Sequence, residues 1–176
     1  PNEKLSSLTI PNPNCYYGTC KLDAERTLKG LVAGTDTEVV IVRCPLVYGP
    51  KVKGNFLALL NLISTGVPLP FGSIKNERSF VFIENLNDFL LKCIQEPRKI
   101  NQILYVSDDF DVSTAELVTE CYRYLKLKNR LFPIRKDVIY FALIAAGRKS
   151  LAISLLDNLQ VDIKDAKEIL CWKPKI

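Results

Sequence analysis

Apolar residues recur along the chain in patterns that alternate between helix and strand. From Tyr17 to about Gly34 they lie at helical spacing on one stripe, which predicts an amphipathic helix closed by the glycine. The segment 38–44 (EVVIVRC) is β-branched with little alternation, which is typical of a strand buried on both faces of a parallel sheet. Residues 43–50 then predict a rigid loop with two prolines and a glycine. Because ligands bind beyond the carboxyl ends of strands in open α/β sheets, this loop is expected beside a ligand site.

The rest of the chain continues this alternation. Asn85 is placed to cap a helix, and Ser113 with Glu116 forms a capping box at the start of another. Strands alternate with helices, so the fold class is α/β. About three strands are predicted, which is few for a complete doubly wound sheet. The further expected elements are helices over 54–66, 85–94, 114–125, 138–147, 149–159 and 164–170, and strands over 79–83 and 103–107.

Composition narrows the class of protein. The 176 residues suit one domain, or one and a part, and 48% hydrophobic with 24% charged residues is ordinary for a soluble globular protein. The net charge of +5 is scattered along the chain, so no nucleic-acid partner is expected. There is no histidine, which removes His-based triads and His metal sites. The longest apolar run, 138–147, is too short to span a bilayer, and no signal peptide is visible, so a cytoplasmic location is expected.

Two further features concern cysteine and methionine. None of the six cysteines forms a CxxC pair and several lie in apolar periodic segments, which favours buried free thiols in a reducing compartment. The chain has no methionine and begins with Pro1. We therefore expect a fragment of a longer protein, or a product trimmed at its N-terminus.

Tyr17 and Lys21 are the first candidates for chemistry. Their spacing of four places both side chains on one face of the predicted helix, one turn apart. A neighbouring ammonium favours the phenolate form, so such a pair can act as a general acid/base near neutral pH. The spacing alone does not identify the pair, and at least two of the three matches are expected to be surface helix pairs. The other two matches are Tyr122 with Lys126, where Tyr122 lies on an apolar stripe, and Tyr124 with Lys128.

Three landmarks stand in order along the chain: YYGTCKLDAE at 16–25, VVIVRCPLVYGP at 39–50 and RSFVFIENLNDFLLKCI at 78–94. Together they resemble the extended short-chain dehydrogenase/reductase family, the NAD-dependent nucleotide-sugar epimerases and dehydratases. The likeness runs from about residue 10 to 174. The segment 52–88 is similar to that of a subgroup of bacterial UDP-sugar enzymes of surface-polysaccharide synthesis. The resemblance implies a Rossmann-type sheet, NAD as cofactor and a UDP-sugar as substrate.

The resemblance also indicates what this chain lacks. The family begins with a Rossmann half that carries a glycine-rich phosphate loop and, later, a catalytic Ser or Thr, whereas no two glycines here have the G-x-G spacing. The chain therefore resembles the C-terminal part of such an enzyme, partnered by a missing N-terminal half and inactive alone. Residues 1–50 are expected to be the remnant of the dinucleotide domain and 51–176 the substrate domain, with 78–96 packing back on the Rossmann part.

The resemblance assigns roles around the predicted active site. Tyr17 is implied to be the acid/base for the sugar 4-hydroxyl, and Lys21 to hold the nicotinamide ribose and lower the pKa of the Tyr. Pro45 and Tyr48 lie in the loop that passes the nicotinamide in the family, the alternative being a plain exit from the strand. Relatives often have Asn at the position of Leu46, so that contact is lost here.

Three more residues match substrate-binding positions of the family. Asn55 is implied to contact the UDP phosphates, with a helix cap as the alternative. Phe71 is implied to line the uracil site, with a core position as the alternative. Arg78 is implied to bind the diphosphate, as a guanidinium does through bidentate bonds. Its alternative is a surface ion pair with Glu77 or Glu84.

Several functional alternatives stay open. The main hypothesis is hydride transfer at the sugar 4-hydroxyl by an epimerase or dehydrogenase, and the sequence does not separate these from a dehydratase. A second hypothesis is a non-enzymatic Rossmann-like module that senses a dinucleotide or binds a partner, and a third is a stand-alone UDP-binding domain. The resemblance also implies a ribose-binding carboxylate near the C-terminus, for which Asp157 and Asp162 are both candidates. By analogy, a homodimer through helices flanking the Tyr-Lys pair is expected.

Overall fold

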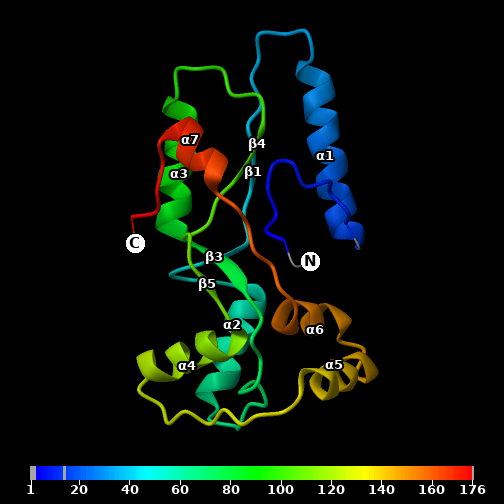
Figure 1. The fold of residues 1–176 in the computed structure, drawn as a ribbon, viewed down its shortest axis with the longest axis vertical. Coiled ribbons are helices and arrows are strands. Elements are labelled where there is room, and N and C mark those ends of the chain that lie inside the picture. Colours follow the sequence, from blue (N-terminus) through cyan, green and yellow to red (C-terminus); the bar gives the residue numbers. More distant parts are fainter. Residues whose placement is uncertain (1–2, 14, 176) are drawn as a thin grey trace.

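The computed structural model of the protein describes residues 3–13 and 15–175. Its helices and short strands alternate along the chain (Figure 1), which confirms the α/β class. The helices are α1 (Tyr16–Val32), α2 (Gly54–Ser64), α3 (Ile83–Gln95), α4 (Thr114–Tyr124), α5 (Lys136–Ala145), α6 (Lys149–Leu156) and α7 (Lys164–Leu170). The strands are β1 (Ile41–Arg43), β2 (Leu46–Tyr48), β3 (Arg78–Phe82), β4 (Ile103–Tyr105) and β5 (Asp111–Val112).

The strands form two small sheets. β1 pairs in parallel with β4, and β2 pairs in parallel with β3, whose other edge carries β5 in antiparallel orientation. Parallel pairing explains why the strand segments are apolar without clear alternation. The predicted burial of the first strand on both faces holds only in part, because Ile41 is buried while the other two residues of β1 are half-buried.

The structure corrects the prediction of a plain rigid loop over 43–50, because residues 46–48 form strand β2. The two prolines flank this strand and do not interrupt it, so the missing N–H groups fall outside its three residues. Gly49 follows with φ 151°, and a Cβ at this position would lie 2.5 Å from the Ile83 side chain. Only glycine fits this close passage of the chain over the start of α3. Strand β5, two residues long, also lies outside the predicted elements.

Side chains pack into two apolar clusters. One cluster lies between α2, α4, α5 and α6, with Ile63 and Tyr122 among its fully buried members. The other joins β3, β4, α3 and α7, where the ring of Trp172 meets Phe89 edge-on at 5.0 Å between centroids. Figure 1 shows the first group of helices at one end of the molecule and α1, α3 and α7 around β1 and β4 at the other. Burial of these apolar surfaces is the main stabilising contribution to such a fold.

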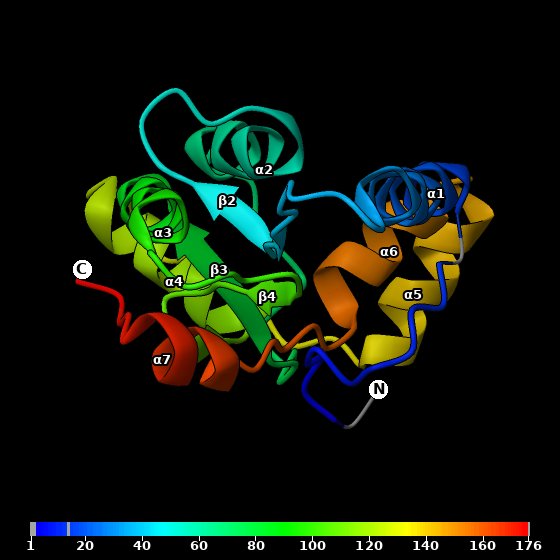
Figure 2. The same ribbon diagram turned by 90° about the horizontal axis from the view of Figure 1, so that it is seen from above.

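Helix α1 confirms the predicted helix but not a buried stripe. None of its residues is buried, and Leu31 is 71% exposed. The helix ends as predicted, because Gly34 follows the C-cap residue with φ 78°. Figures 1 and 2 show α1 standing at one side of the molecule, with α4 at the opposite side in both views.

The two predicted helix caps have different outcomes. The capping box is confirmed, because the Glu116 N–H donates to Ser113 Oγ at 3.1 Å and the Ser113 N–H donates to Glu116 Oε2 at 2.7 Å. The cap at Asn85 is wrong, because α3 begins at Ile83 and places Asn85 inside its first turn. There its amide donates to Asp108 Oδ1 at 2.8 Å. The Asp108 carboxylate also accepts the Phe82 N–H at 3.0 Å, so a distant side chain satisfies the helix start.

All six cysteines are free, as predicted, but only Cys121 is buried and Cys93 half-buried. The prediction of buried thiols is therefore wrong for the other four, which are Cys15, Cys20, Cys44 and Cys171. Periodic position does not ensure burial, since Cys20 lies on α1, where nothing is buried. No helix within the described residues is both long enough and apolar enough to cross a membrane.

Candidate active site

Tyr17 and Lys21 lie in the first two turns of α1. The helix starts after Cys15, whose Sγ accepts the Gly18 N–H at 3.4 Å in the manner of an N-cap. The Lys21 Nζ lies 5.5 Å from the centroid of the Tyr17 ring, so the two side chains share one face of the helix as their spacing predicts. Tyr17 is 72% exposed, and among the described residues no carboxylate pairs with Lys21. Both functional groups are therefore open to a ligand.

The two rival pairs do not share this geometry. Helix α4 ends at Tyr124, so both Lys126 and Lys128 lie beyond it. Tyr122 is 1% exposed and its hydroxyl donates to the Val67 carbonyl at 3.3 Å, which confirms the expectation that it is packed. Of the three spacing matches, Tyr17 and Lys21 alone lie within one helix.

A polar network holds α1 against the carboxyl ends of β1 and β4. Arg43, the last residue of β1, donates through Nε to Glu25 Oε1 at 2.9 Å and through Nη2 to Glu25 Oε2 at 2.6 Å. Its Nη1 also donates to the hydroxyl of Tyr105, the last residue of β4, at 3.0 Å. The hydrogen bonds to Glu25 raise the pKa of Arg43, so its charge is permanent. This network places the helix that carries the Tyr-Lys pair beside the strand ends, where α/β folds bind ligands.

The sequence analysis did not single out Glu25 or Tyr105. Glu25 lies on α1, eight residues beyond Tyr17, and its partner is 18 residues away in sequence. The one available signal was an arginine that ends an otherwise apolar strand, because such a charge needs a partner nearby.

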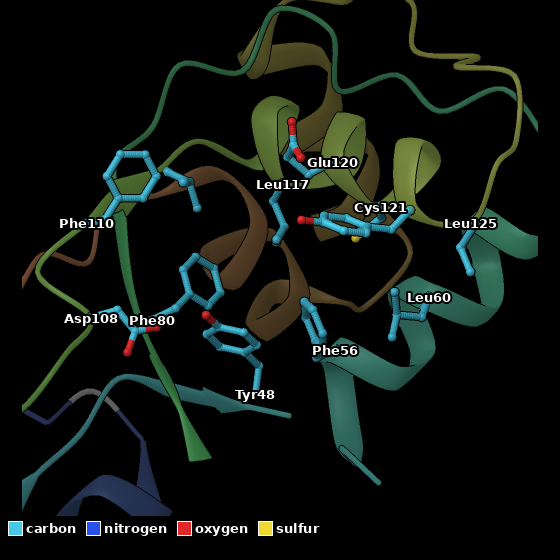
Figure 3. A pocket seen from close by; sticks show the side chains of 12 residues that line it. Tyr48, Phe56, Leu60, Phe80, Asp108, Phe110, Leu117, Glu120, Cys121 and Leu125 are labelled. Carbon is cyan, nitrogen blue, oxygen red and sulfur yellow. The ribbon is translucent and has the colours of Figure 1, made fainter. Parts of the chain in front are cut away.

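Pro45 and Tyr48, which were predicted to lie near the nicotinamide, have different surroundings in the structure. Pro45 is buried between β1 and β2. Tyr48, at the end of β2, lines a pocket of about 560 Å³ (Figure 3). Burial and a hydrogen bond to the Asp108 carboxylate raise the pKa of the Tyr48 phenol to about 12. The pocket is lined by Tyr48, Phe56, Leu60, Phe80, Asp108, Phe110, Val112, Leu117, Glu120, Cys121, Tyr124 and Leu125.

Asn55 and Phe71 lie in different surroundings. Asn55 is the exposed second residue of α2, whose N-cap is Lys53 without a side-chain cap bond, so the alternative of a helix cap is wrong for Asn55. Its position at a helix N-terminus still suits an anion. Phe71 is 6% exposed and lies in the cluster between α2, α4, α5 and α6, which is the core position considered as its alternative.

Arg78 is half-buried at the start of β3 and reaches the C-terminal end of α6. Its Nη1 donates to the Asp157 carbonyl at 2.7 Å and to the Ile153 carbonyl at 3.4 Å. Burial lowers the pKa of Arg78, and the nearby Asp157 opposes that shift. Neither Glu77 nor Glu84 pairs with it among residues 3–13 and 15–175, so the alternative of a surface ion pair is wrong. A cation at a helix C-terminus is stabilised by the carbonyl groups there.

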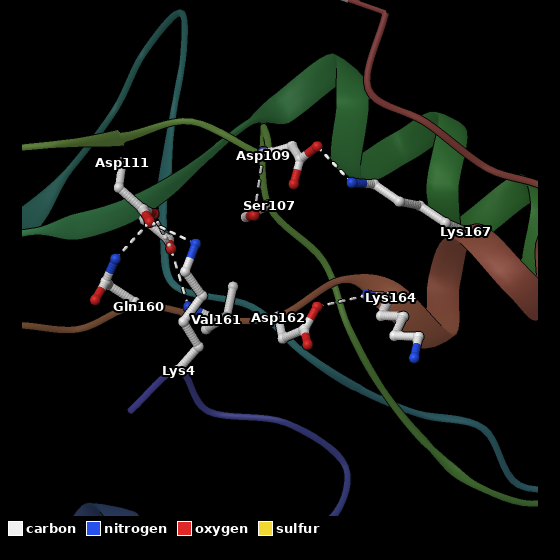
Figure 4. Close-up of polar contacts among 10 residues, drawn as sticks. Lys4, Ser107, Asp109, Asp111, Gln160, Val161, Asp162, Lys164 and Lys167 are labelled. Carbon is white, nitrogen blue, oxygen red and sulfur yellow. Dashed lines mark hydrogen bonds and ion pairs between the residues drawn. The ribbon is translucent and has the colours of Figure 1, made fainter. Parts of the chain in front are cut away.

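The segment before α1 is anchored to the extended segment that joins α6 to α7. The Leu5 N–H donates to the Gln160 carbonyl at 2.8 Å, and the Asp162 N–H donates to the Leu5 carbonyl at the same distance. Beside them the Asp111 carboxylate accepts bonds from Lys4 Nζ at 3.1 Å and Gln160 Nε2 at 2.7 Å (Figure 4). Both candidates for the ribose-binding carboxylate have partners within the chain. The Asp157 carboxylate pairs with Lys136 Nζ at 3.1 Å, and the Asp162 carboxylate accepts the Lys164 N–H at 2.9 Å.

Comparison with known proteins identifies the family. The sequence profile of the NAD dependent epimerase/dehydratase family matches residues 1–107, which is more than half of the chain. The UDP-glucose 4-epimerase of Vibrio cholerae is 44% identical over 165 residues, which cover 92% of this chain and 50% of that protein. The chain thus spans about half the length of this relative.

Solved structures with the same fold include enzymes of this kind. The UDP-glucuronic acid 4-epimerase from Bacillus cereus, solved with NAD, superposes with a TM-score of 0.75 at 16% identity, covering 99% of this chain and 52% of that one. The dTDP-glucose 4,6-dehydratase from Bacillus anthracis, also with NAD, gives 0.74 at 14% identity, with the same coverage. At these identities the structures establish a Rossmann-type fold alone. By its sequence match and its fold, the chain belongs to the NAD-dependent epimerase/dehydratase family.

Proposed function

We propose that this chain is the C-terminal part of an NAD-dependent UDP-sugar epimerase or dehydrogenase that acts at the sugar 4-hydroxyl, in the synthesis of surface polysaccharides. The observation that carries the proposal is the Tyr17–Lys21 pair, exposed at the start of a helix pinned to the carboxyl ends of two parallel strands. The 44% identity to a UDP-glucose 4-epimerase supports a UDP-sugar as substrate.

The residues at this edge fit a nicotinamide cofactor. No carboxylate of the described residues pairs with Lys21, so its ammonium suits the ribose hydroxyls. The exposed phenol of Tyr17 lies on the same face of α1. In this proposal Tyr17 removes the proton of the sugar 4-hydroxyl as general base, and later returns it as general acid. Bound NAD supplies the hydride acceptor for the sugar carbon. Pro45 and Tyr48 are proposed to border the nicotinamide through the segment that joins β1 to β2.

Three residues are proposed to hold the UDP group. Asn55 lies in the first turn of α2, where backbone N–H groups and the helix dipole favour phosphate. Among the described residues, the bonds of Arg78 use Nη1, which leaves Nε and Nη2 as donors for a diphosphate. Phe71 is proposed to line the uracil site from the core side.

The larger organisation follows the same proposal. Residues 1–50 belong to the dinucleotide domain and 51–176 to the substrate domain. Residues 78–96 pack back on the first part, a division that the pairing of β3 with β2 supports. An N-terminal Rossmann half completes the cofactor site, so this chain alone is inactive. The proposal includes a cytoplasmic location and a homodimer.

The test is a substitution of Tyr17 in the full natural protein that contains this chain. Tyr17→Phe is expected to lower turnover of UDP-glucose, UDP-galactose or their N-acetylated counterparts by about 100-fold or more, since positioned acid/base groups contribute at least that much. Binding of UDP, measured by calorimetry, is expected to be unchanged. The control is Tyr124→Phe, which removes an exposed hydroxyl on the opposite side of the molecule.

Two outcomes would contradict the proposal. Unchanged turnover in Tyr17→Phe would remove the acid/base role from this residue. A natural protein that binds NAD but converts no UDP-sugar would instead support the non-enzymatic dinucleotide-sensing alternative.

A further inference from the structure

We propose that the pocket between α2, α4 and the sheet β2-β3-β5 is a second binding site, which takes an uncharged small molecule with an aromatic ring. We call it the α2–α4 pocket; its lining residues are those given above with Figure 3. Its volume of about 560 Å³ lies within the range of roughly 300–1,000 Å³ that small-molecule sites occupy. The inference does not depend on the proposed function.

The α2–α4 pocket is separate from the Tyr-Lys pair. Among the residues predicted for cofactor and substrate, Tyr48 alone lines it. Helix α1, which carries Tyr17, and helix α4, which forms one wall of the pocket, lie on opposite sides of the molecule in Figures 1 and 2. A ligand in this pocket would therefore share only Tyr48 with the residues proposed for the cofactor and the substrate.

Aromatic rings form one wall of the pocket. The Tyr48 ring meets Phe80 edge-on at 6.4 Å and Phe56 at 6.3 Å between centroids. Figure 3 shows these rings on one side of the space, with Leu117 and Cys121 of α4 on the other. Ring faces and edges presented in this way favour another aromatic ring in offset or edge-to-face contact.

The two carboxylates of the pocket, Asp108 and Glu120, are already paired, which argues against a charged ligand. Asp108 accepts bonds from the Phe82 N–H and from the Asn85 amide, and its carboxylate contributes to the raised pKa of the Tyr48 phenol. Glu120 pairs with Arg123, whose Nε lies 2.9 Å from its carboxylate. A cationic ligand would compete with these partners, and an anionic ligand would meet two carboxylates. The rest of the lining is mostly apolar, which favours an uncharged ligand.

Two aromatic side chains at the rim of the pocket are largely exposed to solvent. Phe110 is 70% exposed and Tyr124 is 77% exposed, although both contribute to the lining of the pocket. Removing this apolar surface from water on binding adds to affinity at roughly 25 cal/mol per Å² buried. The exposed rim and the preformed interior together favour a ring-bearing small molecule that bridges them.

Indole, an uncharged aromatic molecule, is the probe for the test. In the full natural protein, indole is expected to give saturation-transfer signals and nuclear Overhauser contacts to the methyl groups of Leu117 and Leu125. Leu117→Trp fills the pocket and is expected to weaken indole binding at least about tenfold. Leu127→Trp is the matched control, because Leu127 lies beyond α4 and outside the lining. The methyl contacts in the unaltered protein do not depend on whether the filled variant folds.

Two competitors complete the experiment. Tryptamine, which adds an ammonium to the same ring system, is expected to bind at least about tenfold more weakly than indole, since its charge must enter an apolar space. Excess UDP is expected to leave indole bound. Absence of contacts to Leu117 and Leu125, equal binding to Leu117→Trp, or tighter binding of tryptamine would each overturn the proposal. Displacement by UDP would show that the pocket belongs to the nucleotide-sugar site and is not a second one.

Discussion

Arg43 and Glu25 join β1 to α1 through two parallel hydrogen bonds, 2.9 Å from Nε to Oε1 and 2.6 Å from Nη2 to Oε2. Both side chains are less than one-fifth exposed, at 18% and 19%. This planar fork is the geometry in which guanidinium and carboxylate bind most strongly. Because α1 buries no residue of its own, the pair is a main attachment of the helix that carries Tyr17.

Replacing Glu25 by Gln is the first predicted change. It removes the charge that compensates Arg43 and breaks one of the two bonds, so the free energy of unfolding is expected to fall by about 2 kcal/mol. Urea denaturation measures the change. Asp23→Asn is the control, because its pair with Arg26 is exposed on the same helix and contributes at most about 0.5 kcal/mol. Equal losses of unfolding free energy in the two variants would show that the Arg43–Glu25 pair stabilises the fold no more than an exposed ion pair does.

Asn76 carries the second prediction. This buried side chain donates to the carbonyls of Leu155 and Asp157, each at 3.2 Å, and accepts the Thr114 N–H at 2.9 Å. It therefore joins the start of α4 to the end of α6. Asn76→Ala leaves the Thr114 N–H without its acceptor, while the Asp157 and Leu155 carbonyls keep their bonds from Arg78 Nη1 and the Thr114 hydroxyl. The loss of three bonds with one buried donor unsatisfied is expected to lower the free energy of unfolding by about 2 kcal/mol.

The control for Asn76 is Asn61→Ala, an exposed position on α2. This change is expected to shift the denaturation midpoint little or slightly upward, since alanine favours helix. A loss at Asn61 as large as at Asn76 would contradict the role given to the buried amide.

Local features of the fold could be predicted from sequence because their causes lie within a few residues. The capping box joins Ser113 to Glu116, and Gly34 follows its own helix. Features that depend on distant partners could not be predicted. The Arg43–Glu25 bond spans 18 positions and the Asn76–Asp157 bond spans 81. No periodicity encodes such a pairing, because each partner is compatible with its own element in many folds.

The candidate site shows the same division. The spacing of four gave three Tyr-Lys pairs of equal standing, and the end of α4 at Tyr124 separates Tyr17 and Lys21 from the others. Strand β2 was missed because prolines usually mark a loop, whereas here they stand at its borders. The burial of Phe71 and the α2–α4 pocket depend on how helices pack, which is a tertiary property.

Cysteine reactivity provides the third prediction. At neutral pH, N-ethylmaleimide is expected to modify Cys15, Cys20 and Cys171 quickly and Cys121 only slowly. Cys44 is expected to react more slowly than the other three exposed cysteines, because partial burial of its thiol raises its pKa. Burial raises the pKa of Cys121 and that of Cys93, the latter to about 11, so little reactive thiolate forms at either position. Peptide mapping by mass spectrometry after timed quenching measures each rate. Unfolding in urea serves as the control, because it must bring all six rates together.

The fourth prediction concerns the pH dependence of stability through Tyr48. Burial, and then the bond to Asp108, raise the pKa of its phenol to about 12 in the folded protein, whereas an unfolded tyrosine ionises near pH 10. Between these two values the unfolded chain has released the proton and the folded protein still holds it. The free energy of unfolding therefore falls as pH rises through this window. Below about pH 10 the contribution of Tyr48 is fully present and constant.

Comparison with Tyr48→Phe isolates this effect. The variant has no phenol to ionise at this position, so its stability is expected to fall less steeply than that of the unaltered protein between about pH 10 and 12. Urea denaturation at about pH 9 and again at about pH 11.5 measures both slopes. Tyr124→Phe, which removes an exposed phenol, is the control and is expected to keep the steeper slope. If the free energy of unfolding falls equally steeply with pH in Tyr48→Phe and in the unaltered protein, the phenol ionises alike in the folded and unfolded states. Solvent then reaches the Tyr48 hydroxyl in the folded protein.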